Sequence, residues 1–285
     1  MKDALNHRKR RSPSFTLVEL LVAEAIFLIL LALIFQLFLG IAQNAQDQKK
    51  RMDSLGEARQ ALDHFNLDWT ARVRRSDVNA LFTKANGNDQ ISFLTQANTY
   101  SGTRQLACVS YQVNPITQVT QGSQTNQTYG LQRGIVGYNW LSTDAAVAQL
   151  LSFPYTPTAS TLSACYFEPM AKTVFRLEFC FLQSVPAGST NAFTTTNSFL
   201  NLNSSNFVGV VVAVAALDQQ NRQMLTPAQV ASLSANFPDA VDAQDPQSTW
   251  VPIVNNSAAL ATNAGIPLKA ASAVRIFQRI FHVNE

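Results

Sequence analysis

The sequence predicts an α+β protein in which a long N-terminal helix packs on an antiparallel β-sheet. Residues 15–42 are almost wholly apolar and lead directly into an amphipathic pattern over residues 43–75. The remaining chain, residues 76–285, alternates between short apolar runs rich in β-branched and aromatic residues and polar stretches rich in serine, threonine and asparagine. The first pattern is typical of one continuous helix, and the second is typical of strands joined by loops.

Residues 1–14 form a short basic leader. Its five basic residues are Lys2, Arg8, Lys9, Arg10 and Arg11, and its one acidic residue is Asp3. The whole chain has a formal net charge of +3, and outside the leader the basic and acidic residues nearly balance. The positive charge therefore belongs to the leader, and the rest of the chain gives no indication of nucleic-acid binding.

The apolar stretch 15–42 predicts a transmembrane helix. It would be about 40 Å long, which exceeds a hydrocarbon core of about 30 Å. The basic leader places the N-terminus in the cytoplasm and the following chain outside. The alternatives are a secretory signal peptide cut after Gly40 and Ala42, whose apolar region is usually only about 7–15 residues long, and an uncut signal anchor. Neither explains Glu19, since a charge at bilayer depth costs about 2.5–3.5 kcal/mol.

The segment "SFTLVELLVAEAIF", residues 14–27, resembles the N-terminal signature of type IV pilins and pseudopilins. The resemblance implies that prepilin peptidase cuts between Ser14 and Phe15 and that the new amino group of Phe15 is methylated. It also implies that Glu19 pairs with the terminal amine of a neighbouring subunit during filament assembly, which neutralises an acid otherwise stranded in lipid. Two features depart from the family pattern: Ser14 stands where the family usually has glycine, and Glu24 is an additional acid.

The resemblance further implies a pilin-like fold and a single-pass protein of the bacterial inner membrane with an extracytoplasmic C-terminal domain. Such a chain is a structural subunit of a type IV pilus or a type II secretion-like filament. Its partners are prepilin peptidase, other pilin or pseudopilin subunits and the lipid bilayer. The segment "EARQALDHFNLDWTARVRRSD" is similar to J-type minor pseudopilins and to Verru_Chthon cassette protein C. The alternative is an uncut bitopic envelope protein with a periplasmic binding or enzymatic domain.

Residues 43–75 predict an amphipathic continuation of the helix with one packing stripe, because apolar residues recur at every third or fourth position. The stripe consists of Met52, Leu55, Ala58, Leu62, Phe65, Trp69 and Val73. Two helices hinged near Gly40 are the alternative, since glycine costs about 1 kcal/mol in a helix interior.

Five segments predict strands: Ile91–Thr95, Ala107–Val113, Leu131–Tyr138, Val174–Leu182 and Phe207–Leu217. In "VFRLEFCFL", residues 174–182, Phe175, Leu177, Phe179 and Phe181 alternate with Arg176 and Glu178. This alternation predicts a strand with one packed face and one face toward solvent.

Thr226 and Pro227 predict the N-cap and first position of a short helix. Residues 183–206 and 239–265 are polar and predict loops, and residues 269–284 favour a helix over a strand.

No catalytic, cofactor-binding or metal-binding residue is predicted, and we expect no enzymatic activity. After the leader the histidines are His64 and His282, and the cysteines lack zinc-ligand spacing. The sequence has no phosphate-binding glycine loop and no nucleophile elbow. Asp239, Asp242 and Asp245 supply oxygen ligands of the kind that Ca²⁺ prefers, but their spacing favours a solvated acidic loop.

The cysteines predict one disulfide, because an exported domain meets an oxidising compartment. Cys165 and Cys180 flank a segment that would fold back as a hairpin near Glu168–Thr173. Closing this loop would contribute up to about 3 kcal/mol. We predict a Cys165–Cys180 disulfide with a buried Cys108 thiol, and three buried thiols are the alternative.

Overall fold

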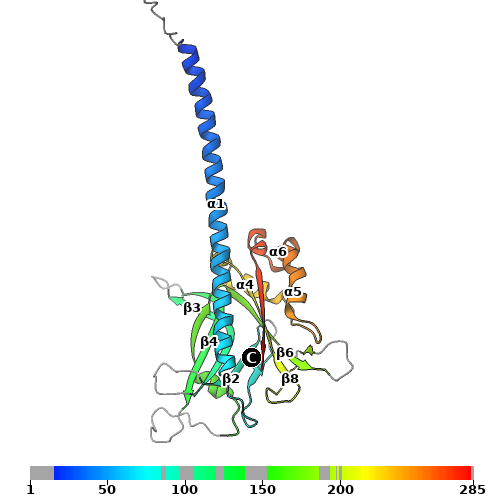
Figure 1. Cartoon of the computed structure of the whole chain (residues 1–285). Coiled ribbons are helices and arrows are strands. Elements are labelled where there is room, and N and C mark those ends of the chain that lie inside the picture. The colour runs from blue at the N-terminus through cyan, green and yellow to red at the C-terminus, as the bar shows by residue number, and fades with distance from the viewer. Residues whose placement is uncertain are drawn as a thin grey trace, which may run out of the picture. The chain divides into compact units, whose positions relative to one another are not determined.

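The computed structural model describes residues 16–84, 88–96, 106–119, 125–138, 153–185, 193–196, 198 and 201–283. The fold class is α+β, as predicted, with a long N-terminal helix and antiparallel strands (Figure 1). The chain divides into two compact units, residues 1–49 and residues 50–285. The division falls inside the first helix, so the end of this helix belongs to the β-rich unit.

Helix α1 spans Leu17–Thr70 without a break at Gly40, so the alternative of two hinged helices does not apply. Its first part, Leu17–Gln46, is long and apolar enough to cross a membrane. All of its side chains are exposed in the isolated chain. This segment therefore has the length and composition of a membrane anchor.

The last turns of α1 lie in the main hydrophobic core of the β-rich unit. The buried residues of these turns are Ala58, Ala61, Leu62, Phe65 and Trp69, which confirms the central part of the predicted stripe. The Phe65 ring contacts the rings of Phe93 and Tyr111 in one sheet and of Phe179 and Phe281 in the other. The end of α1 thus packs between two sheets.

The first sheet has five antiparallel strands in the order β1-β2-β3-β4-β5. Their bounds are β1 Leu81–Thr83, β2 Gln90–Thr95, β3 Leu106–Val119, β4 Thr125–Tyr138 and β5 Tyr166–Ala171. The three strands predicted in this region are confirmed, and β3 and β4 extend beyond the predicted bounds. Each strand pairs with the next along the chain, so the sheet is a meander.

The second sheet has four antiparallel strands in the order β7-β6-β8-β9. Their bounds are β6 Val174–Ser184, β7 Phe193–Thr196, β8 Phe207–Ala216 and β9 Arg275–His282. The sequence predicted one sheet, and the chain has two because it crosses between them at Lys172 and Thr173. Strand β5 pairs with β4, whereas β6 pairs with β7 and β8, so the hairpin predicted near Glu168–Thr173 does not form.

Strand β6 is buried on both faces, which corrects the prediction of a solvent-facing side. Leu177, Phe179 and Phe181 pack in the main core, as predicted. Phe175 instead belongs to a second core on the opposite face, because the register shifts between Val174 and Arg176. Arg176 and Glu178 are also fully buried.

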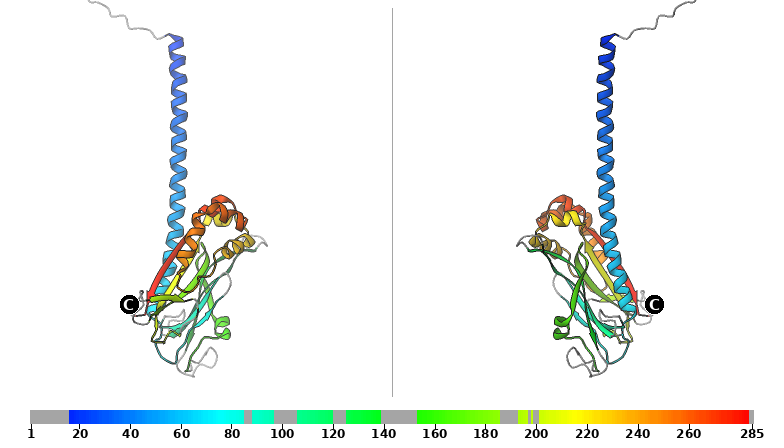
Figure 2. Two further views of the ribbon diagram at one scale, coloured as in Figure 1. Left: turned by 90° about the vertical axis from the view of Figure 1, so that its right-hand side faces the viewer. Right: turned by 90° about the vertical axis from the view of Figure 1, so that its left-hand side faces the viewer.

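A layer of short helices covers the second core. The helices of this layer are α3 Gln219–Gln223, α4 Pro227–Ala235, α5 Pro246–Asn255, α6 Ser257–Ala264 and α7 Leu268–Ser272. The other described short helix, α2 Ala159–Ala164, lies apart from them beside β4. Figure 2 shows the C-terminal helices gathered together beside the second sheet. Trp250 of α5 and Phe237 stack edge to face, and Phe237 meets Phe175 of β6 in the same way.

The structure corrects the predictions for three segments between residues 183 and 284. Helix α4 begins at Pro227 with Thr226 as its N-cap, as predicted, but residues 239–265 contain α5 and α6 rather than a loop. Their N-caps are Asp245 and Asn256, residue types that also favour turns. Residues 183–206 include β7, and residues 269–284 contain the end of α7 followed by β9 rather than one helix.

Candidate functional site

The N-terminal motif is described from Thr16 onward, so Ser14 and Phe15 lie outside the described residues. Glu19 stands in the first turn of α1. Its Oε2 accepts hydrogen bonds from the Thr16 backbone N–H and hydroxyl, both at 2.9 Å, and the Glu19 N–H donates to Thr16 Oγ1 at 3.3 Å. This reciprocal arrangement is a capping box. The Thr-x-x-Glu spacing is visible in the sequence, and sequence reasoning did not use it.

A second site lies beside strand β6, where five charged side chains meet. This charge cluster consists of Lys84, Asp89, Arg176, Glu178 and Asp239. Lys84 follows β1, Asp89 precedes β2, Arg176 and Glu178 lie on β6, and Asp239 follows α4. The cluster therefore joins the two sheets and the helical layer of the β-rich unit.

Within the charge cluster the two cations lie between the three carboxylates. The Lys84 ammonium is 3.1 Å from Asp89 Oδ2 and contacts Glu178 Oε1 directly. Arg176 Nη2 donates to Glu178 Oε2 at 2.8 Å and to Asp239 Oδ1 at 2.6 Å. The side chains of Asp89, Glu178 and Arg176 have no exposed surface, whereas Lys84 and Asp239 keep 27% and 28%. Fully ionised, the cluster carries one more negative than positive charge.

Asp89 also completes the edge of β6. Its backbone N–H donates to the carbonyl of Leu177 at 3.1 Å, and its Oδ2 accepts from the N–H of Phe179 at 2.9 Å. The neighbouring Asn88 Oδ1 accepts from the N–H of Leu177 at 2.8 Å. The segment before β2 thus forms hydrogen bonds with backbone groups of β6 that β7 does not reach. These hydrogen bonds hold Asp89 beside Glu178.

Burial sets the protonation of this site. Burial, together with the charge of Asp89, raises the pKa of Glu178 to about 7. Burial also raises the pKa of Asp89. Burial lowers the pKa of Lys84, but the charges of Asp89 and Glu178 outweigh that effect and raise it. Lys84 therefore stays protonated near neutral pH, whereas both the ionised and the neutral form of Glu178 are present there.

The three acids of the charge cluster are residue types that can bind a metal ion. One carboxylate oxygen from each of Asp89, Glu178 and Asp239 lies within 4.8 Å of the others. Oxygen ligands of this kind suit hard divalent cations. However, Lys84 and Arg176 already place positive charges against the same oxygens, so a metal would have to displace an internal cation. The donor set fits an internal ion-pair network better than a metal centre.

The three aspartates considered for Ca²⁺ each have a separate partner. Asp239 pairs with Arg176, Asp242 Oδ1 accepts from the Thr196 hydroxyl at 2.9 Å, and Asp245 caps α5 by accepting from the Ser248 N–H at 2.9 Å. The segment is therefore neither a metal-binding loop nor a simple solvated loop, because its carboxylates hold neighbouring elements.

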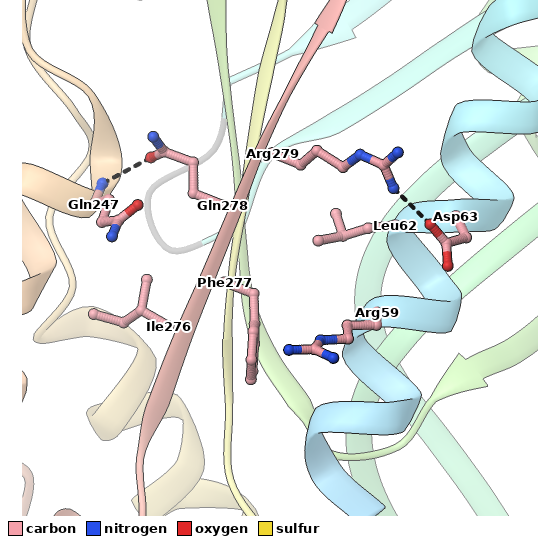
Figure 3. A pocket seen from close by; sticks show the side chains of 8 residues that line it. All are labelled: Arg59, Leu62, Asp63, Gln247, Ile276, Phe277, Gln278 and Arg279. Carbon is pink, nitrogen blue, oxygen red and sulfur yellow. Dashed lines mark hydrogen bonds and ion pairs between the residues drawn. The ribbon is translucent and has the colours of Figure 1, made fainter. Parts of the chain in front are cut away.

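A groove of about 450 Å³ lies between α1 and the edge strand β9. Figure 3 shows Arg279 of β9 reaching toward α1, where it pairs with Asp63, while Gln278 points to the opposite side and accepts a hydrogen bond from the Gln247 N–H of α5. Arg59 and Leu62 complete the α1 side. The groove combines a strand edge with polar walls, which suits protein contact better than small-molecule catalysis.

The cysteines do not form the predicted disulfide. Cys165 caps the C-terminus of α2, whereas Cys180 lies on β6 in a small core with Leu182 and Val211. Both remain thiols, as does Cys108, which is buried near Tyr155 on the outer face of the first sheet. The prediction fails because β5 and β6 belong to different sheets and carry the two sulfur atoms apart.

Comparison with known proteins identifies no family: no family model matches the chain, and no curated protein matches it at a significant level.

Proposed function

We propose that this protein is a membrane-anchored, pilin-like structural subunit that assembles through its N-terminal helix into a type IV pilus or type II secretion-like filament. The observation that carries the proposal is the position of Glu19 at the start of the apolar segment Leu17–Gln46. Prepilin peptidase would cut between Ser14 and Phe15, and the Phe15 amino group would be methylated.

The capping box between Thr16 and Glu19 is compatible with this role, because it leaves the charge of the Glu19 carboxylate unpaired. Thr16 satisfies hydrogen-bonding capacity of one Glu19 oxygen, but it brings no positive charge to the carboxylate. An ionised carboxylate near the hydrocarbon core is costly unless it is paired. The terminal amine of a neighbouring subunit would supply that charge, so association of the helices would be favoured over the isolated subunit.

In this proposal the β-rich unit presents a binding surface outside the inner membrane. The unit is tied to the helix because the last turns of α1 form its core.

The mass of the mature N-terminus tests the processing step. Expressed in a bacterium that has a prepilin peptidase, the chain should begin at Phe15 and carry one N-terminal methyl group. Ser14→Gly should accelerate the cut because the pocket is shaped for the smallest side chain, and Ser14→Leu should block it. A chain that still begins at Met1 would instead favour the uncut envelope anchor.

Three substitutions separate charge pairing from helix capping. Glu19→Ala should keep membrane insertion and lose co-purification with partner pilins. Glu19→Gln retains a side chain suited to a capping box but no charge, so it should fail in assembly like alanine. Glu24 lies about 140° around the helix from Glu19. Glu24→Gln is therefore the matched control and should assemble normally. Normal assembly of Glu19→Gln would show that capping alone is required.

A further inference from the structure

The charge cluster places an amine against a buried carboxyl group across two sheets. Lys84 lies just after β1 of the first sheet, and Glu178 lies on β6 of the second. The ammonium nitrogen of Lys84 contacts Glu178 Oε1, although 94 positions separate the two residues. Asp89 touches the same ammonium at 3.1 Å. The amine of Lys84 and the carboxyl groups of Glu178 and Asp89 therefore lie together at one largely buried site.

We propose that Lys84 and Glu178 condense into an intramolecular amide, an isopeptide bond that links the two sheets covalently, with Asp89 as the proton carrier. The proposal concerns a modification of the β-rich unit and is independent of how the N-terminal helix is processed or assembled.

The step balances without an oxidant or a cofactor. The Lys84 nitrogen attacks Glu178 Cδ, a C–N bond forms, and one C–O bond of the carboxyl group breaks. Asp89 accepts one proton from the Lys84 ammonium and passes it to a Glu178 oxygen, which gives a neutral amine and a neutral acid. Of the three original ammonium protons, one then stays on the amide nitrogen and two leave with the departing oxygen as water. The Oδ1 of Asp89 has no hydrogen-bond partner among the described residues, so it can take the ammonium proton.

The carboxyl group of Glu178 is polarised on both oxygens. Oε1 accepts from the backbone N–H of Ala240 at 3.1 Å, and Oε2 accepts from Arg176 Nη2 at 2.8 Å. Donors fixed in this way stabilise the oxyanion that forms when the amine attacks. Because the pKa of Glu178 is raised to about 7 by burial and the charge of Asp89, its neutral acid form is present near neutral pH. The attack therefore meets an electrophile rather than a carboxylate alone.

Position and burial favour the amide over the ion pair. Two reacting groups that the fold holds in contact can reach effective molarities of about 10⁵ M or more. This offsets the tendency of an amide to hydrolyse in water. Glu178 has no exposed surface, and replacing two buried charges with a neutral amide removes the cost of keeping both out of water. The amide would also supply the covalent cross-link that disulfides supply in other exported domains, since Cys108, Cys165 and Cys180 form no disulfide.

Intact mass under denaturing and reducing conditions tests the proposal on the purified full-length chain. The expected mass is lower than the sequence mass, after correction for N-terminal processing, by one water. A digest should contain one branched peptide that joins the segment around Lys84 to the segment around Glu178. Wild-type protein at full mass would overturn the proposal, as would a water loss confined to one linear peptide or mapped between Lys84 and Asp89.

Variants test the roles of the two neighbours. Lys84→Met and Asp89→Asn should both have the full sequence mass, the first because the nucleophile is absent and the second because the proton carrier is. Lys172→Met is the matched control: it removes an exposed lysine in the β5–β6 turn and should keep the loss of one water. An unchanged water loss in Lys84→Met would contradict the assignment, and the wild-type measurement stands even where a variant fails to fold.

Discussion

Arg133 of β4 holds Asp68, near the end of α1, by two parallel hydrogen bonds, Nε to Oδ2 at 2.7 Å and Nη2 to Oδ1 at 2.9 Å. The hydroxyl of Tyr111 on β3 donates to the same Oδ2 at 2.5 Å. A bidentate guanidinium–carboxylate pair fixes direction as well as distance. The last turn of α1 is therefore locked to the first sheet at one residue.

Asp68→Ala should lower the free energy of unfolding by about 3 kcal/mol, because it leaves a largely buried guanidinium and a buried phenol without their acceptor. Urea unfolding followed by tryptophan fluorescence measures the change. Asp63→Ala is the control, since it removes an exposed pair with Arg279 and should cost less than about 1 kcal/mol. Equal effects of the two substitutions would contradict the role of Asp68.

Gly209→Ala should destabilise the second sheet, whereas Gly56→Ala should not. A Cβ at position 209 would overlap the backbone carbonyl oxygen of Phe281 on the paired strand β9. Relieving such an overlap costs about 1–3 kcal/mol. At Gly56, on the exposed side of α1, nothing lies within 4 Å, and alanine should raise helix stability by about 1 kcal/mol. Thermal unfolding of the two variants gives shifts of opposite sign if this packing is correct.

The N-cap Asp245 should make α5 sensitive to acid. Burial raises its pKa, but hydrogen bonds from Gln278 and Ser248 outweigh that effect and lower it below the usual value of 3.8. A lowered folded-state pKa means that the contribution is complete above the unfolded value and is lost as the pH falls through the folded value.

Two substitutions at this position isolate the charge. Asp245→Ala should cost about 1 kcal/mol at neutral pH. Asp245→Asn keeps a capping side chain and should lose part of the acid sensitivity. Hydrogen exchange of the α5 amides at neutral and acidic pH measures both. Acid sensitivity in Asp245→Asn equal to that of the wild type would assign the effect to other groups.

Cys108 and Cys180 should resist alkylation in the folded protein, and Cys165 should react first. The first two thiols are buried, and burial raises the pKa of each to about 12. Cys165 is only partly buried, although burial still raises its pKa to about 11. Mass spectrometry before and after denaturation counts the labels. A disulfide-linked peptide containing Cys165 and Cys180 would contradict the placement of β5 and β6 in separate sheets.

Local patterns predicted the elements whose signal lies within one segment. The spacing of Ala58, Leu62, Phe65 and Trp69 identified the buried face of α1, since a helix repeats its faces every three or four residues. Thr226 before Pro227 identified the start of α4, because capping uses only neighbouring residues. The central strands of both sheets followed from their alternation and β-branched composition.

What covers each face of a strand depends on residues far away in the chain, and periodicity does not contain that information. Arg176 and Glu178 looked like a solvent face, yet α4, α5 and their neighbours cover β6, and the balancing charges come from Lys84, Asp89 and Asp239. The disulfide prediction failed for the same reason. Cys165 and Cys180 flank one segment of the sequence, but their sulfur atoms would meet only if β5 and β6 paired with each other. Charges and thiols acquire partners through long-range packing, so the helix was predictable from the sequence and the charge cluster was not.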